Sequence, residues 1–314
     1  MNFRTTLQLP PAPKKITYYT PIVSIGSCFA QNIATRFAYY KFPITANPFG
    51  VLFHPIAIQK VIQRALAQQP YTPEDFFLHN ELWHSFSLHS DISKPELQET
   101  ISFANTQQNK LYQALKEAQF FFITFGTAWV YTHKTTREMV ANCHKVPQTH
   151  FSKHLLSVEE IQQSIYQIIS SVKTLNPHIE CICTISPVRH LKDGFLENQV
   201  SKSHLFAALY PLISKQTCHY FPSYELLLDE LRDYRFYTDD MVHPSELAIN
   251  YIWQQLTATY IDTDTQKTMK QIDNIQKSLA HRPFNPHTES HKAFQEQLQQ
   301  KIAAIQAQYP HIQF

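Results

Sequence analysis

Residues 21–30 read Pro21-Ile22-Val23-Ser24-Ile25-Gly26-Ser27-Cys28-Phe29-Ala30, and this stretch decides the fold. Its first half is apolar and β-branched, as in a short buried strand. A glycine then permits a sharp turn, and the pattern over residues 28–40 predicts a helix. A strand, a glycine turn and a helix start form the first half of a βαβ unit. The segment therefore predicts an α/β protein with a parallel sheet.

The rest of the chain continues this alternation of strands and helices. Further strands are predicted at residues 42–45, 120–125, 179–185 and 218–221. Amphipathic helices are predicted at residues 157–174, 199–214 and 245–259. Strands that alternate with helices in this way are typical of a parallel sheet covered on both faces.

The domain organisation follows from the segments that break the alternation. Residues 1–263 are predicted to form the α/β domain, with a helical insertion at about residues 55–118 and a hairpin at about residues 128–142. Residues 264–314 are rich in Gln, Lys and His and predict a helical C-terminal extension.

Composition and charge exclude several classes of partner. The 314 residues include 27 basic and 25 acidic side chains, with no basic run. Nucleic acid and anionic membrane surfaces are therefore not expected as partners. The N-terminus lacks an apolar stretch, no window approaches a transmembrane helix, and five scattered cysteines indicate reduced thiols. We expect a cytoplasmic protein, and its oligomeric state stays open.

The chain contains only four glycines, where an average composition predicts about 22. All four, Gly26, Gly50, Gly126 and Gly194, follow predicted strands. Ligands bind outside the carboxyl ends of the strands in an open parallel sheet. The glycines therefore mark a candidate crevice.

Cys28 is a candidate nucleophile because it follows the first glycine turn. A side chain at a helix N-terminus lies near exposed N–H groups, which favour an anion and lower the pKa of a thiol. In the competing interpretation, Ser27 caps the helix and Cys28 belongs to the core.

Asp240 and His243 are a candidate acid–base pair in Asp239-Asp240-Met241-Val242-His243-Pro244. An aspartate three residues before a histidine can orient the imidazole through Nδ1 and leave Nε2 free as a general base. The competing interpretation is a solvated helix start with Pro244 in its first turn.

Several motifs together resemble one family. Gly26-Ser27-Cys28-Phe29-Ala30 spells the name motif of the GSCFA family of SGNH/GDSL-like hydrolases. Five further motifs also resemble that family and occur in the expected order: residues 47–53, 124–129, 142–145, 186–190 and 240–244. The resemblance covers residues 22 to about 256.

The resemblance implies a three-layer α/β/α sandwich of the SGNH/flavodoxin-like type. It also implies a nucleophile after the first strand and an Asp–His pair after the last. Aligning Gly26 with the superfamily's Gly-Asp-Ser motif places Cys28 at the nucleophile, with Ser27 as the alternative.

The resemblance further implies an oxyanion hole with three donors. By position, the first two are the N–H groups of Cys28 and Gly50. The third should be an asparagine two residues after Gly126, but alanine stands there. Thr127 or Asn142 could replace it, and the loss of one donor costs about 10²–10³ in rate.

Other polar residues near the strand ends complete the set of candidates. Arg189 and His190 are predicted to bind an anionic group of a substrate, such as a phosphate, a uronate or coenzyme A. Lys202 is expected to be an exposed basic residue. His144 is a possible site residue. Neither a metal nor another cofactor is expected, because Cys181 and Cys183 lack further ligands at zinc spacing.

These features predict a hydrolase that acts on a small-molecule or saccharide acyl ester by a Cys/Ser-His-Asp mechanism. An acyltransferase that uses an acyl carrier such as coenzyme A is the first alternative. A catalytically inactive binding or scaffold protein with the same fold is the second.

Overall fold

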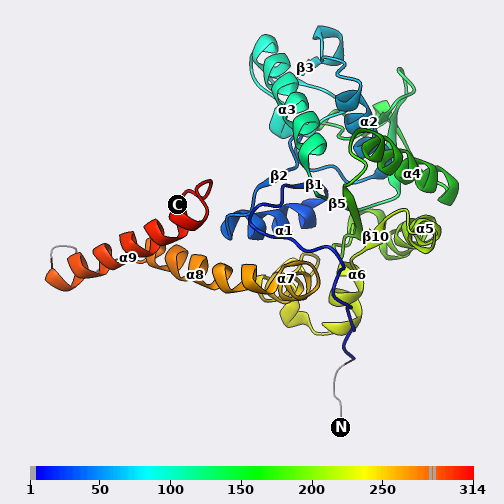
Figure 1. Ribbon diagram of the computed structural model, residues 1–314. Coiled ribbons are helices and arrows are strands. Elements are labelled where there is room, and N and C mark those ends of the chain that lie inside the picture. The colour runs from blue at the N-terminus through cyan, green and yellow to red at the C-terminus, as the bar shows by residue number, and fades with distance from the viewer. Residues whose placement is uncertain (1–4, 283–284, 286–287) are drawn as a thin grey trace.

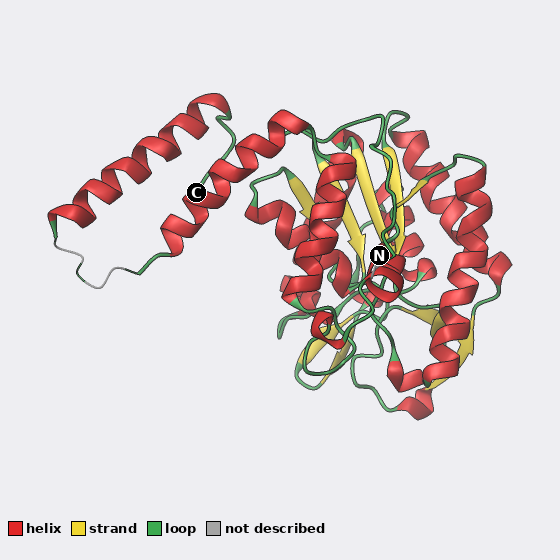
Figure 2. Ribbon diagram, turned by 90° about the horizontal axis from the view of Figure 1, so that it is seen from below, coloured by secondary structure: helices red, strands yellow, loops and turns green. Residues whose placement is uncertain are grey.

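The computed structural model describes residues 5–282, 285 and 288–314. A parallel sheet lies in the centre with helices on both faces, and two helices project from this body (Figures 1 and 2). The elements run in the order β1 (Ile22–Gly26), α1 (Cys28–Tyr39), β2 (Ile44–Ala46), α2 (Pro55–Leu66), β3 (Phe77–His79), β4 (Leu82–His84), α3 (Leu97–Glu117), β5 (Phe120–Phe125), β6 (Trp129–His133), β7 (Met139–Val140), β8 (Phe151–Leu155), α4 (Val158–Leu175), β9 (Glu180–Ile185), α5 (Phe195–Ser214), β10 (His219–Tyr220), α6 (Ser223–Glu225), α7 (Glu246–Tyr260), α8 (Thr263–Ala280) and α9 (Glu289–Gln308).

The central sheet has the strand order β2–β1–β5–β9–β10, and all of its pairs are parallel. Ile22 pairs with Phe120 at one end of β1, and Gly26 pairs with Thr124 at the other. The chain first builds outward from β1 to β2 and then crosses back to β5. The order therefore reverses between β1 and β5, where doubly wound sheets bind their ligands.

The two faces of the sheet are buried by different helices because side chains alternate along each strand. Val23 and Ile123 point into one core, which α2, α3, α4 and α5 cover. Ile22 and Phe122 point into the other core, which α1 and α7 cover. Helices that share a face lie side by side in Figure 1. The prediction of a parallel sheet covered on both faces is confirmed.

Two elements differ from the sequence prediction. The segment 55–118 is not wholly helical, because β3 and β4 form an antiparallel hairpin between α2 and α3. The predicted hairpin at residues 128–142 is part of a three-stranded sheet in the order β7–β6–β8. Its extra strand, β8, pairs antiparallel with β6 along five residues.

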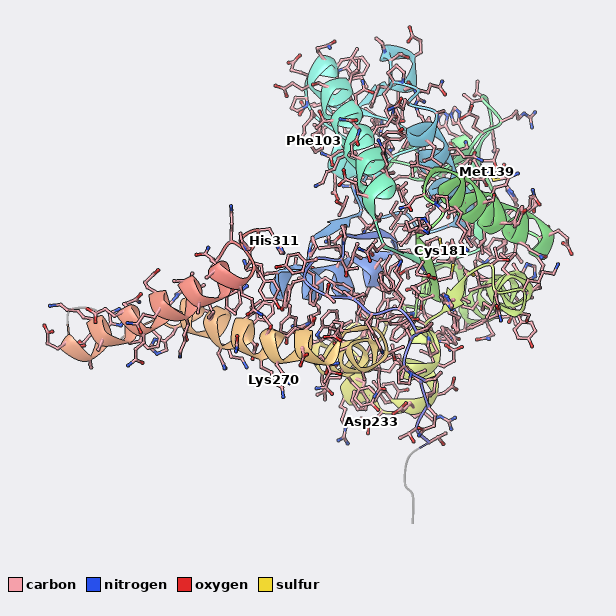
Figure 3. The ribbon with its side chains drawn as sticks, viewed as in Figure 1. Phe103, Met139, Cys181, Asp233, Lys270 and His311 are labelled. Carbon is pink, nitrogen blue, oxygen red and sulfur yellow. The ribbon has the colours of Figure 1, made fainter. Side chains whose placement is uncertain are left out.

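The helices α8 and α9 form an antiparallel arm beside α1 (Figure 1). The exposed Lys270 lies along this arm, whereas Cys181 lies inside the body (Figure 3). The end of the arm returns to the N-terminal segment, where the Tyr19 hydroxyl donates to the Gln308 carbonyl at 3.0 Å. Among the residues that the structure describes, no helix has the length and apolarity needed to cross a membrane.

Gly26 is fixed by its backbone conformation and by its neighbour on β5. Its φ of +150° is one that other L-residues rarely adopt, and an added Cβ would lie 2.3 Å from the Thr124 carbonyl oxygen. We expect Gly26→Ala to lower the free energy of unfolding by about 2–4 kcal/mol, measured by urea titration.

The matched control for Gly26→Ala is Gly126→Ala. The nearest contact of its added Cβ is 3.2 Å, and its φ lies outside the left-handed region. We expect a loss of about 1 kcal/mol there. Equal losses in the two variants would contradict the claim that the backbone of Gly26 is strained for any other residue.

Candidate active site

The turn that follows β1 is held by hydrogen bonds from three directions. Asn47 Oδ1 accepts the Gly26 N–H at 2.9 Å, and the Thr124 carbonyl accepts the Ser27 N–H at 3.3 Å. The Leu52 N–H donates to the Gly26 carbonyl at 3.0 Å. The turn therefore fixes Cys28 as the first residue of α1.

Ser27 and Cys28 differ in exposure. The Ser27 side chain is 1% exposed, and its hydroxyl has no hydrogen-bond partner among the described residues. Cys28 is half-buried. Cys28 is therefore the more accessible of the two candidate nucleophiles, whereas the Ser27 hydroxyl is buried.

The protonation of Cys28 reflects opposing effects. Burial raises the pKa of the Cys28 thiol above its ordinary value, and the Asp240 charge adds to this. The N–H groups of Phe29 and of Cys28 itself lower the pKa, as does the Lys202 charge. The expectation of a lowered pKa is therefore wrong, because loss of water outweighs the helix N-terminus. Cys28 rests as a thiol and needs a base.

Asp240 and His243 form the pair that their spacing predicts. His243 Nδ1 lies 2.6 Å from Asp240 Oδ2 in the loop before α7. Asp240 Oδ1 accepts the N–H groups of Val242 and His243, each at 2.9 Å, and the Thr238 hydroxyl at 2.7 Å. The donors from His243 and then Val242 hold the pKa of Asp240 well below its ordinary value. Asp240 is therefore a fixed carboxylate that orients the imidazole.

The Asp240–His243 loop is electrostatically coupled to the strand ends. Asp240 raises the pKa of Cys28, and His243 contributes to the lowered pKa of His190. His190 follows β9, and Cys28 follows β1. Groups from three separate segments thus act on one another at the carboxyl edge of the sheet.

Two of the predicted oxyanion donors have other partners. The Gly50 N–H donates to the Asn47 carbonyl at 2.8 Å, closing the turn that follows β2. The Thr127 hydroxyl lies 3.1 Å from Ser201 Oγ and accepts the Trp129 N–H at 3.0 Å. Both groups hold loops together in this structure.

Asn142 and His144 belong to a separate hydrogen-bond network. Asn142 Nδ2 donates to the Ser90 hydroxyl at 3.3 Å, and Asn142 Oδ1 accepts the His144 N–H at 2.9 Å. The His144 ring uses Nδ1 with Ser90 and Nε2 with the Ser85 carbonyl, at 3.2 and 2.7 Å. Burial lowers the pKa of His144 to about 4, so the ring is neutral. These residues tie the hairpin sheet to the loop that contains Ser85 and Ser90.

Arg189 and His190 follow β9 and face different neighbours. Burial raises the pKa of Tyr224 and of Tyr237, and the Arg189 charge opposes both increases. The two tyrosine rings are therefore neighbours of the Arg189 guanidinium. The His190 ring meets the Phe53 ring edge-on, with centroids 5.6 Å apart.

Lys202 is a buried residue of the site, whereas the sequence predicts an exposed basic side chain. It is 0% exposed, and its ammonium donates to the carbonyls of Gly126 and Ser186 at 2.6 and 2.7 Å. It therefore joins the carboxyl ends of β5 and β9. Burial and, to a lesser extent, the Arg189 charge lower the pKa of Lys202 to about 7, and Cys28 opposes the shift. The predicted surface position is wrong because this residue lies on the inner face of α5.

The buried charge of Lys202 predicts a pH-dependent stability. The folded pKa lies below the ordinary 10.5, so the unfolded chain binds more protons between about pH 7 and pH 10.5. The free-energy cost of burying the Lys202 ammonium is therefore complete below pH 7 and becomes smaller as the pH rises. We expect the unfolding free energy of wild type, relative to Lys202→Met, to increase from pH 7 to pH 10 in urea titrations.

Lys173→Met is the matched control for Lys202→Met. Lys173 also donates to a carbonyl, that of Thr217 at 2.8 Å, but it lies on α4 and is partly exposed. A difference between wild type and Lys202→Met that stays constant over this pH range would contradict a depressed Lys202 pKa.

Within residues 5–282, 285 and 288–314, no group of three or more His, Cys, Asp or Glu side chains could hold a metal ion.

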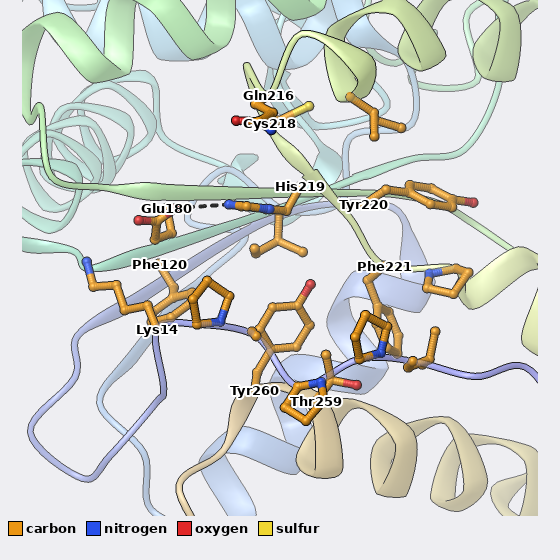
Figure 4. A pocket seen from close by; sticks show the side chains of 18 residues that line it. Lys14, Phe120, Glu180, Gln216, Cys218, His219, Tyr220, Phe221, Thr259 and Tyr260 are labelled. Atoms are coloured by element: carbon orange, nitrogen blue, oxygen red, sulfur yellow. Dashed lines mark ion pairs between the residues drawn. The ribbon is translucent and has the colours of Figure 1, made fainter.

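The pocket drawn in Figure 4 is separate from the candidate site. This pocket of about 280 Å³ includes Phe120 and Glu180, where β5 and β9 begin (Figure 4). It therefore lies toward the amino ends of the strands, away from Cys28.

Comparison with known proteins gives two matches. The model of the GSCFA family matches residues 21–256. The model described as GSCFA domain protein, C-terminal domain, matches residues 272–314 and so covers the second half of α8 and all of α9. No curated protein matches the sequence.

Proposed function

The chain belongs to the GSCFA family, and we propose that it is an SGNH-like hydrolase that acts on an acyl ester through Cys28, His243 and Asp240. The observation that carries the proposal is the Asp240–His243 pair, whose carboxylate lies near enough to Cys28, the first residue of α1, for its charge to raise the pKa of the thiol. The parallel order β2–β1–β5–β9–β10 supports an assignment to the SGNH/flavodoxin-like sandwiches.

In the proposed reaction, His243 Nε2 accepts the proton of the Cys28 thiol. The sulfur then forms a bond to the acyl carbon, and the carbonyl π electrons move to the oxygen. When this tetrahedral intermediate collapses, the bond to the leaving alcohol breaks and His243 returns the proton to that oxygen. Water, activated by the same imidazole, hydrolyses the thioester and releases the acid. Asp240 orients and stabilises the imidazolium throughout.

Arg189 gives the proposed site a means of recognising an anionic group. Its guanidinium follows β9 and acts on the ring hydroxyls of Tyr224 and Tyr237. A guanidinium binds carboxylate or phosphate oxygens in a bidentate manner. The proposed substrate is a small-molecule or saccharide acyl ester, and an acyl carrier such as coenzyme A is an acyl donor that this charge would also suit.

A panel of p-nitrophenyl acyl esters and acyl-CoA donors tests the proposal with wild type and His243→Ala. We expect turnover by wild type and its loss in the variant. Transfer to an added alcohol instead of water would identify an acyltransferase. Equal rates for the two proteins across the panel would contradict the proposal and favour a binding protein that keeps the fold.

A further inference from the structure

The proposed reaction places negative charge on an oxygen near Cys28, and that oxygen needs donors. The N–H groups of Gly50 and the side chains of Thr127 and Asn142 are all bonded to other groups. The N–H groups of Cys28 and Phe29 remain, since they open α1 and lower the Cys28 pKa through contact with its sulfur. The family resemblance implies three donors, so the third must come from elsewhere.

His190 lies beside the turn that contains Cys28. A Cβ added to Gly126 would lie 3.4 Å from His190 Nε2 and 3.5 Å from Ser27 Cβ. The His190 imidazole and the nucleophile turn therefore lie on either side of Gly126, with room for about one methyl group between them. The φ of Gly126 is not left-handed, and the tightest contact of the added Cβ is the Phe53 carbonyl oxygen at 3.2 Å, so His190 and Ser27 lie at ordinary contact distance from this position.

The His190 ring is held in place without using its nitrogens. The Asn198 Oδ1 accepts the His190 backbone N–H at 2.9 Å, and the Phe53 ring packs edge-on against the imidazole. Neither ring nitrogen has a hydrogen-bond partner among the described residues. A donor on this ring is thus available to a ligand.

Burial, with help from its neighbours, keeps His190 neutral. Burial is the largest cause that lowers the pKa of His190 to about 4, Lys202 and His243 act in the same direction, and Asp193 opposes them. At neutral pH the imidazole has one N–H to donate and does not compete with His243 for the proton of Cys28. A neutral donor aimed at developing charge is what an oxyanion site requires.

We propose that the imidazole of His190 donates a hydrogen bond to the oxyanion formed when Cys28 attacks, in place of the asparagine that the family resemblance implies. The inference rests on the proposed function, because it assigns a donor to that reaction. His190 is then a catalytic residue that acts after the carbon–sulfur bond forms. It has no role in ionising Cys28.

A ketone that adds reversibly to Cys28 tests the inference without a known substrate. The thiol of Cys28 adds across the carbonyl of 1,1,1-trifluoroacetone: a carbon–sulfur bond forms, the C=O π bond breaks, and the thiol proton passes to His243. The resulting oxyanion resembles the tetrahedral intermediate. The measurement is the ketone concentration that halves the rate of Cys28 alkylation by iodoacetamide, followed by mass spectrometry of the Cys28 peptide.

We expect His190→Ala to need about 10²–10³ times more ketone than wild type, and His190→Asn to restore much of the protection. Alkylation without ketone forms no oxyanion, so its rate should stay within about threefold of wild type. The matched control is His204→Ala, because His204 is also half-buried but bonds the Leu156 carbonyl at 2.8 Å. Thermal unfolding by circular dichroism checks that each variant is folded.

The outcomes separate this inference from the proposed function. Wild-type protection that is unchanged in His190→Ala and His190→Asn would overturn the role of His190 alone. Wild type that gains no protection from the ketone would overturn addition at Cys28, and the inference with it.

Discussion

Replacing Cys28 by alanine is expected to lower kcat/KM for an activated acyl ester by about 10⁴–10⁶, because it removes the sulfur that forms the acyl intermediate in the proposed reaction. The variant keeps the turn intact, since Gly26 and Asn47 hold it through backbone and amide groups. The small Cβ of alanine also fits wherever the cysteine Cβ fits. Loss of activity would therefore report the loss of the sulfur and not of the fold.

Ser27→Ala is the matched control for Cys28→Ala. The Ser27 hydroxyl is buried and has no partner among the described residues, so its removal costs little and can even stabilise the chain. We expect kcat/KM within about threefold of wild type. Full turnover in Cys28→Ala together with its loss in Ser27→Ala would reverse the assignment of the nucleophile.

Replacing Asp240 by asparagine is expected to lower kcat by about 10³–10⁴. The carboxylate holds His243 Nδ1 at 2.6 Å and stabilises the imidazolium that forms when Cys28 loses its proton. An amide in its place presents an oxygen without the charge, or a nitrogen that fixes the wrong tautomer. The loss should appear in kcat, because the carboxylate acts mainly after the substrate has bound.

Asp239→Asn is the matched control, because Asp239 is the adjacent exposed carboxylate in the same loop. It changes the net charge equally and leaves the bond to His243 untouched. Steady-state kinetics with a p-nitrophenyl ester compare the two variants. Equal losses in both would show that the loop contributes only its charge, and would remove Asp240 from the mechanism.

The parts of the fold that follow hydrophobic patterns could be predicted from the sequence. The strand at residues 120–125 is predicted to the residue, because a run that is apolar at all but one position is what a strand covered on both faces requires. The β3–β4 hairpin was missed because its turn residues, Asn80 and Glu81, lack the usual glycine. Both have positive φ, 47° and 65°. With four glycines in the chain, other residues occupy such turns, and the common sequence signal is absent.

In the candidate site, too, local features could be predicted from the sequence, whereas contacts between distant segments could not. The Asp240–His243 pair was predictable because three residues of loop fix both groups locally. Hydrogen bonds between distant segments were not predictable, so the bond from the Gly26 N–H to Asn47 Oδ1, 21 residues along the chain, could only be seen in the structure. Lys202 had a signal that was overlooked: it lies four residues after the buried Asn198 and three before the buried Leu205, on the inner face of α5.

The most direct test of the central claim is the position of the acyl group after the protein is mixed with p-nitrophenyl acetate and quenched in acid. Mass spectrometry of the digested protein locates the modified side chain. The account predicts one acetyl group on Cys28, formed slowly in His243→Ala and absent in Cys28→Ala. Acetyl on Ser27, or a wild-type Cys28 that is never acetylated, would contradict it.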